Sequence, residues 1–285
     1  MVKPLFGVFL AGVIGFGSTN PSQAGELAMD DRVPHLDEGG QTGYRDFLQS
    51  GAYRAFAIAP GGAWAWYGDA LSDSEARQEA LAYCADQTDQ SCVLYAVNDQ
   101  RVFEEEKWPT LWGPYAHADS AAAAPIGTRR GQRFPDLAFT NPDGESQTLS
   151  ALQGKVTIVH FWGSWCTPCQ VEFPEMQALF DDVGGNVDIK FVLLQSREPI
   201  SKSRRWAARM GTSLPLSDSG TMGAGDAQFS ASDGTSLPDR TLAPVFPSTY
   251  VLDKHGIVVH AQIGPTLNWP EYAPFLEDAA KKSGR

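Results

Sequence analysis

The distribution of apolar residues along the chain predicts two α/β segments of different size. In the smaller segment, an aromatic-rich stretch is interrupted by Pro60-Gly61-Gly62, and an alanine-rich stretch with apolar residues at helical spacing follows it. Ser72 or Asp73 supplies an N-cap for the alanine-rich stretch. The predicted elements are, in order, a hairpin over 54–67, a helix over 74–85 and a strand over 92–97.

In the larger segment, continuous apolar runs alternate with stretches of helical character, which is typical of an α/β domain. The runs at 156–161 and 187–194 are typical of strands that are buried on both faces. The other predicted elements are strands over 248–252 and 257–262, and helices over 171–180, 201–210 and 270–282.

Three further stretches lack this regularity. Residues 25–50 are polar and contain several glycines, which indicates an extended lead-in, and residues 212–245 indicate a mobile or partner-contacting insertion. The composition around 113–130 is that of a linker. We therefore expect a signal peptide over 1–24, a small α/β module over 25–112, a linker over 113–130 and a larger domain over 131–285.

The first 24 residues have the pattern of an export signal. Lys3 precedes a short apolar run, and Ser22-Gln23-Ala24 offers small residues at the positions that a signal peptidase reads. We expect an exported, periplasmic protein, with an uncleaved membrane anchor as the alternative. The run is short for a helix that spans a bilayer.

The net charge argues against a nucleic-acid partner, and the distribution of histidines argues against a metal site. The 285 residues carry a formal net charge of -12, whereas a phosphate backbone requires a basic face, so no nucleic-acid partner is expected. His35, His117, His255 and His260 are scattered along the chain, and we expect neither a metal site nor a cofactor from them.

The four cysteines form two close pairs, one in each predicted segment. An even number of cysteines in an exported chain favours disulfides, and the simplest pairing is the local one, Cys84 with Cys92 and Cys166 with Cys169. A Cys84–Cys92 disulfide would join the end of the predicted helix to the next strand. It would thereby stabilise a module too small to bury much surface.

The Cys166-Thr167-Pro168-Cys169 motif lies between a predicted buried strand and a predicted helix. Cys166 then stands at a helix N-terminus, where free N–H groups and the helix dipole stabilise a thiolate. Cys169 lies one turn further along, within reach of a mixed disulfide formed at Cys166. Half of a zinc site and a structural disulfide are the alternatives, but the strand–CxxC–helix context favours redox chemistry.

Residues 131–283 resemble the TlpA/ResA-like branch of the thioredoxin superfamily. The resemblance is carried by 131–137, 149–155, the active-site stretch 161–169, Glu172-Phe173-Pro174, and 246–253. It implies a thioredoxin-like domain, with a central mixed sheet flanked by helices, after the small α/β module. The module itself weakly resembles DUF4189-like domains, which imply no particular chemistry.

The resemblance also implies roles for single residues. Cys166 would be the attacking thiol and Cys169 the resolving thiol. Glu172 would take and return the proton of Cys169, which requires a carboxyl whose pKa is raised by burial. Pro247 would be a cis-proline that faces the dithiol. The residues implied to contact substrate are Trp165, Pro168 and Phe246.

His160 occupies the position at which many thioredoxins carry a buried aspartate. It could tune the site, or it could be an ordinary buried histidine with satisfied hydrogen bonds. The residues leave both interpretations open.

The expected function is disulfide exchange with exported proteins. The implied partners are the disulfides or thiols of those proteins, and the implied electron donor is a membrane thiol-reductase. The resemblance favours reduction over oxidation, although Thr167-Pro168 does not decide the direction. A copper-binding or redox-sensing protein that uses the same dithiol is the main alternative, and a peroxidase is a lesser one.

Overall fold

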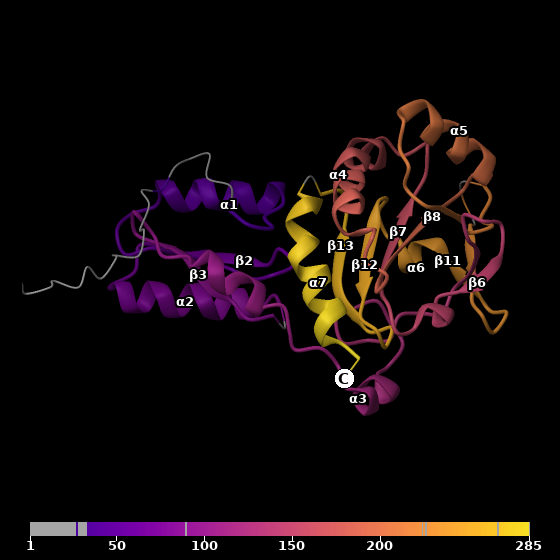
Figure 1. Cartoon of the computed structure of the whole chain (residues 1–285). Helices are drawn as coiled ribbons and strands as arrows, with labels where there is room; N and C mark the ends of the chain where they lie inside the picture. Colours follow the sequence, from indigo (N-terminus) through magenta and orange to yellow (C-terminus); the bar gives the residue numbers. More distant parts are fainter. Residues whose placement is uncertain are drawn as a thin grey trace, which may run out of the picture.

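The computed structural model describes residue 27 and residues 33–88, 90–223, 225, 227–266 and 268–284. The predicted export signal over 1–24 lies outside the described residues. Figure 1 shows a four-stranded sheet at one end of the molecule and a seven-stranded sheet at the other, with α7 (Ala273–Lys282) between them. No helix in the described ranges has the length and apolar character needed to cross a membrane.

The four-stranded sheet has the order β2-β1-β3-β4, and all of its pairings are antiparallel. This part of the molecule contains the predicted hairpin, helix and strand, each within a residue or two of the predicted bounds. The elements of this part are α1 (Glu38–Gln49), β1 (Ala55–Ile58), β2 (Trp64–Tyr67), α2 (Asp73–Ala85), β3 (Val93–Val97), β4 (Gln100–Arg101) and η1 (Glu105–Thr110).

β1 is buried on both faces because a helix covers each side of the sheet. Phe56 and Ile58 belong to the same apolar cluster as residues of α1, whereas Ala55 and Ala57 pack with α2. Successive side chains of a strand point to opposite faces, so this alternation separates large side chains from small ones. α2 begins at the N-cap Ser72, and the Cys84–Cys92 disulfide ties its end to the residue before β3.

The expectation of an extended segment over 25–50 was wrong, because this segment contains α1. Its three glycines argue against a helix on propensity alone. Gly43 is required by tertiary packing, since a Cβ there would lie 2.2 Å from Cζ3 of Trp64. Asp37 caps the helix by accepting a hydrogen bond from the Gly40 N–H, and Tyr44 and Phe47 are buried.

The seven-stranded sheet has the order β13-β12-β7-β8-β9-β5-β6. β7, β8 and β9 are parallel, and the strands on both sides of them are antiparallel, so the sheet is mixed. This arrangement is the predicted thioredoxin-like α/β fold. The strands of this sheet are β5 (Ala138–Thr140), β6 (Ser146–Thr148), β7 (Val156–Trp162), β8 (Ile189–Gln195), β9 (Leu216–Asp218), β12 (Ser248–Leu252) and β13 (Val258–Ile263). β10 (Gln228–Ser230) and β11 (Ser236–Pro238) form a separate two-stranded sheet.

Two helices of this part position the candidate site. α4 (Thr167–Val183) follows β7, and it packs against α7 and η3 (Trp269–Tyr272). α4 begins at Thr167, which is earlier than the predicted bounds and places Cys166 at the N-cap. The other helices are α3 (Ala118–Ala123), η2 (Ser150–Leu152), α5 (Ile200–Met210) and α6 (Asp239–Leu242).

The segment 212–245 is ordered by secondary structure, which the sequence did not predict. It contains β9, the antiparallel β10–β11 hairpin and α6. Phe229 of β10 is buried against Phe161, with ring centroids 4.9 Å apart, and this contact ties the hairpin to the core. The four short elements of this segment carry too few residues for a periodic pattern to show in the sequence.

The module contacts the thioredoxin-like part through an aromatic cluster. His35 stacks on Tyr272 with ring centroids 4.2 Å apart, and Trp112 stacks on Phe275 at 4.5 Å. The segment expected as a linker contains α3, and its Tyr115 hydroxyl donates to Asp278 at 2.8 Å. The domain boundaries stay a prediction, which expression of 131–285 alone would test.

Candidate active site

The candidate site begins where β7 ends. All seven residues of β7 are buried, and the chain leaves the strand at Trp162 to make a short turn before α4. Cys166 is the N-cap residue of α4, and its sulfur accepts a hydrogen bond from the Cys169 N–H at 3.2 Å. Pro168 stands in the first helical turn, where an N–H would have no helical partner in any case.

Cys166 and Cys169 form a disulfide in this structure, with their Cα atoms 5.3 Å apart. Cys166 is 4% exposed, whereas Cys169 is completely buried. Of the two cysteines, only Cys166 keeps any exposed surface. The assignment of Cys166 as the attacking thiol and Cys169 as the resolving thiol stays a prediction.

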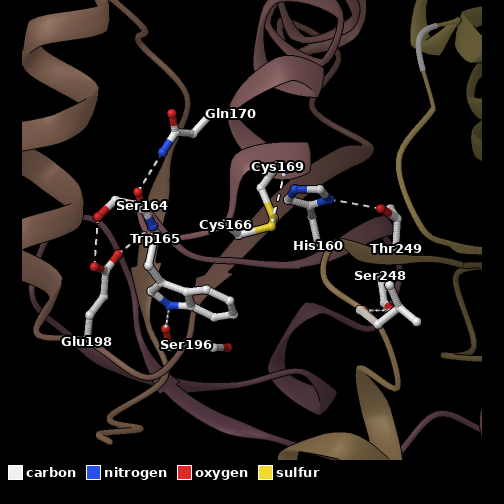
Figure 2. Close-up of a disulfide and its surroundings, with 11 residues drawn as sticks. His160, Ser164, Trp165, Cys166, Cys169, Gln170, Ser196, Glu198, Ser248 and Thr249 are labelled. Atoms are coloured by element: carbon white, nitrogen blue, oxygen red, sulfur yellow. Dashed lines mark hydrogen bonds between the residues drawn. A yellow bond between two sulfur atoms is a disulfide. The ribbon is translucent and has the colours of Figure 1, made fainter. Parts of the chain in front are cut away.

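The active-site turn is held by Glu198, which sequence reasoning missed. The Ser164 N–H donates to Glu198 Oε1 at 2.6 Å, and the Ser164 hydroxyl donates to Oε2 at 2.7 Å (Figure 2). Ser203 of α5 donates to Oε1 as well, at 2.6 Å. Glu198 lies between β8 and α5, so only the parallel pairing of β7 with β8 brings it to the turn.

Glu198 is ionised despite its burial. Burial by itself would raise its pKa, but the hydrogen bonds from Ser203 and Ser164 and the contact with Lys202 outweigh that effect and lower the pKa. A fixed carboxylate of this kind holds two donors of the turn at once. Glu198 thereby restrains the backbone at Ser164, two residues before Cys166.

An exposed Trp165 and a buried Phe246 form an aromatic pair at the site. Their rings meet edge to face, with centroids 5.2 Å apart, and the Trp165 indole N–H donates to the Ser196 carbonyl at 2.8 Å. The Arg197 guanidinium lies over both rings, at 5.7 and 5.2 Å from their centroids. Trp165 is 40% exposed, so it presents a flat aromatic surface beside the disulfide.

Glycine is required at position 163 by this same tryptophan. A Cβ at Gly163 would lie 2.3 Å from the Trp165 indole nitrogen, closer than real Cβ contacts occur. The small residue therefore permits the indole to fold back over the turn.

Glu172 follows Cys169 by three residues on α4, which places the two side chains on the same face of the helix, and it is completely buried. Burial raises its pKa to about 8, although hydrogen bonds from the Trp269 side chain and from the Thr266 backbone act in the opposite direction. The Trp269 indole N–H donates to Glu172 Oε1. The structure thus gives Glu172 the desolvated environment that the sequence predicted for a proton acceptor; the proton transfer itself stays a prediction.

Pro247 lies beside the end of β7. The Phe246–Pro247 peptide bond is cis, as the resemblance implies. Ser248 pairs with Phe161 across β12 and β7, so Pro247 is at the level where the active-site turn leaves the sheet. Its role toward a substrate stays a prediction.

His160 is completely buried, and Figure 2 draws it among the side chains that surround the disulfide. Its Nδ1 is 2.8 Å from the Thr249 hydroxyl, and its Nε2 has no hydrogen-bond partner among the described residues. Burial lowers its pKa to about 3, so the ring is neutral near pH 7. His160 is therefore only half satisfied, which falls between the two interpretations that the sequence left open.

The arrangement is a strand–turn–helix dithiol with a buried carboxylic acid on the same helix face as Cys169. A family model described as Redoxin matches residues 129–273, just over half of the chain. The chain belongs to the redoxin family. Its redoxin domain carries the disulfide, Glu172 and the cis-proline within the matched range.

Two curated relatives of the redoxin domain are bacterial. The thioredoxin-like protein YneN of Bacillus subtilis is 27% identical over 140 residues, which cover 49% of this chain and 74% of that protein. The thiol-disulfide oxidoreductase ResA of Halalkalibacterium halodurans is 26% identical over 136 residues, covering 48% and 69% of the two chains. A solved structure, StoA from Bacillus subtilis, is 20% identical with a TM-score of 0.38, covering 51% of this chain and 98% of that chain.

Together, the family and the site identify the redoxin domain as a thiol–disulfide oxidoreductase of thioredoxin-like fold. The family implies substrates that are protein thiols or disulfides. The matched residues leave the module over 25–112 without a counterpart in the family model.

Proposed function

We propose that the protein is an exported reductase of protein disulfides in which Cys166 attacks and Cys169 resolves. The observation that carries this proposal is the position of Cys166 at the N-cap of α4, with a completely buried Cys169 one turn further along. The Cys166 thiolate would attack one substrate sulfur and release the other as a thiolate. Cys169 would then attack Cys166, which frees the second substrate thiol and leaves the Cys166–Cys169 disulfide.

Glu172 supports this sequence of steps as the proton acceptor for Cys169. A buried thiol must lose its proton before it can attack, and water does not reach Cys169. The pKa of Glu172, about 8, lies near that of an ordinary thiol, so a proton can pass between the two groups at little cost. Glu172 would return the proton when the dithiol is regenerated by a membrane thiol-reductase.

Export and reductive direction are supported by different observations. The apolar run after Lys3 has the pattern of a signal peptide, and the Cys84–Cys92 disulfide is typical of proteins outside the cytosol. The resemblance to the TlpA/ResA-like branch supports reduction. N-terminal sequencing of the exported protein would separate cleavage after Ala24 from a retained anchor.

The reduction potential of Cys166–Cys169 tests the direction. We expect equilibration with glutathione to give a potential of about -200 mV or lower, in the range of reductants and of thioredoxin. A potential near about -120 mV, as in a strong oxidant, would contradict the proposal. Trapping with Cys169→Ala in cells, followed by identification of proteins disulfide-linked to Cys166, would name the substrates.

A further inference from the structure

A groove of about 420 Å³ opens between the module and the redoxin domain, beside the active-site helix. Its walls come from the segment around the start of α1, from the first turns of α4, and from the chain between β13 and η3. The lining residues that matter most are Leu36, Asp37 and Glu38 of the module, Pro168 and Val171 of α4, and Glu271 of η3.

The groove lies near the reacting cysteine along α4, because Pro168 and Val171 of its lining follow Cys166 closely in this helix. Pro168 lies between the two cysteines, and Val171, which is 57% exposed, lies five residues after Cys166. Five helical residues span about 8 Å, which an extended chain covers in two to three residues. A substrate joined to Cys166 would therefore place residues two or three positions from its cysteine at the groove.

The chemistry of the groove is apolar and acidic. Its lining includes three carboxylates and no lysine, arginine or histidine. Two carboxylates are fixed by backbone donors: Asp37 accepts from the Gly40 N–H at 2.8 Å, and Glu271 accepts from the His35 N–H at 3.0 Å. Glu38 is exposed at the start of α1. Such a surface attracts a cationic side chain next to an apolar one.

We propose that this groove binds the polypeptide flanking the substrate disulfide and selects segments with an apolar residue next to lysine or arginine. The inference rests on the proposed exchange at Cys166. It gives the module a part in choosing the substrate, while the redoxin domain performs the chemistry.

The test uses the reduced full chain and two peptides that each contain one intramolecular disulfide. The peptides are identical except that two lysines near one cysteine are replaced by glutamates. In each reaction the peptide S–S bond breaks and the Cys166–Cys169 bond forms. Two electrons pass to the peptide, and the two protons of the enzyme dithiol end on the peptide thiols. Neutral hydroxyethyl disulfide reports the intrinsic reactivity of each protein, and peptide rates are expressed relative to it.

We expect the lysine peptide to react about fivefold faster than the glutamate peptide at low ionic strength, with the ratio shrinking in high salt. Glu38→Lys should remove the preference. Asp46→Lys is the matched control, because Asp46 is exposed on the same helix but does not line the groove. It should keep the wild-type ratio.

Equal rates for the two peptides with the wild-type protein would overturn the inference. So would an equal loss of preference in Asp46→Lys, because net charge and not the groove would then set the rates. A wild-type protein that fails to react even with hydroxyethyl disulfide would overturn the proposed function, and this outcome is distinguishable from both.

Discussion

At the scale of single residues, the groups around the disulfide differ mainly in how far they are withdrawn from water. Cys169, Glu172 and His160 are all completely buried, yet burial moves the two titratable groups in opposite directions. It raises the pKa of Glu172 to about 8 and lowers that of His160 to about 3. Near pH 7 His160 is neutral and Glu172 is mostly protonated, and the ionised fraction of Glu172 that can accept a proton grows toward pH 8. Only Glu172 has a pKa close to that of a thiol.

Glu172→Gln should therefore slow the step in which Cys169 resolves the mixed disulfide, by about 10²-fold. Attack by Cys166 should change much less, because that sulfur is at the N-cap of α4, where the N-terminus of the helix stabilises its thiolate. Single-turnover kinetics with a fluorescent mixed disulfide would separate the two steps.

Trp269→Phe supplies the matched control, since it keeps the carboxyl and removes one hydrogen bond that lowers its pKa. The pH at which resolution accelerates should then move upward. Unchanged resolution in Glu172→Gln would show that Cys169 loses its proton elsewhere.

The site residues that the sequence could reveal are those that lie close together along the chain. The cysteines and Glu172 belong to one strand–turn–helix segment, so the motif indicated redox chemistry at the cysteines and the family resemblance implied the role of Glu172. Glu198 and Arg197 reach the site from the far end of β8, and their contacts depend on the pairing of β7 with β8. No local pattern marks such residues.

At the scale of elements, periodicity predicted the buried strands and the long helices, whose patterns extend over several turns or over whole apolar runs. It failed for α1 because glycines that permit a close contact with Trp64 look like loop residues in isolation. It also failed over 212–245, where β9, β10, β11 and α6 are each only three or four residues long. Packing around Phe229, and not local preference, orders that segment.

The Cys84–Cys92 disulfide belongs to this scale, since it joins α2 to β3 across a short loop. Replacing both cysteines with serine should lower the free energy of unfolding by about 2–3 kcal/mol, from the lost constraint on the unfolded chain. Urea unfolding, monitored by tryptophan fluorescence, measures this change. Thiol–disulfide exchange at Cys166 should persist; if it vanished while the protein stayed folded, the module would take part in the chemistry.

At the scale of the whole molecule, the two sheets are joined through a buried aromatic cluster that contains histidines. His35 stacks on Tyr272, and His260 packs against the same ring at a tilted angle. The pKa values of His35 and His260 are lowered to about 3 and about 4, mainly by burial. The contact therefore requires neutral imidazole rings. Acid pH should weaken it.

The free energy of unfolding should thus fall as the pH drops from about 6.5 toward 4. The unfolded chain takes up protons on His35, His160 and His260 near pH 6.5, whereas the folded protein does so only near the lowered pKa values. Each histidine contributes up to about 1.4 kcal/mol per pH unit. Glu172 acts in the opposite sense, because its raised pKa removes stability as the pH rises from 4.5 to about 8.

Stability should accordingly be greatest near pH 6.5. Urea unfolding of the oxidised protein at pH 5, 6.5 and 8 would measure the profile. His160→Asn should flatten its acid side, since one of the three histidines is then absent. A wild-type protein as stable at pH 5 as at pH 6.5 would show that these histidines are not held neutral.

The account as a whole depends on a thiolate at Cys166, stabilised where α4 begins. The most direct measurement is the rate of alkylation of the reduced protein by iodoacetamide across a range of pH, with Cys169→Ala to isolate Cys166. We expect the rate to reach half of its plateau at a clearly lower pH than it does for free cysteine. An inflection at the pH of free cysteine, or at a higher one, would contradict the account.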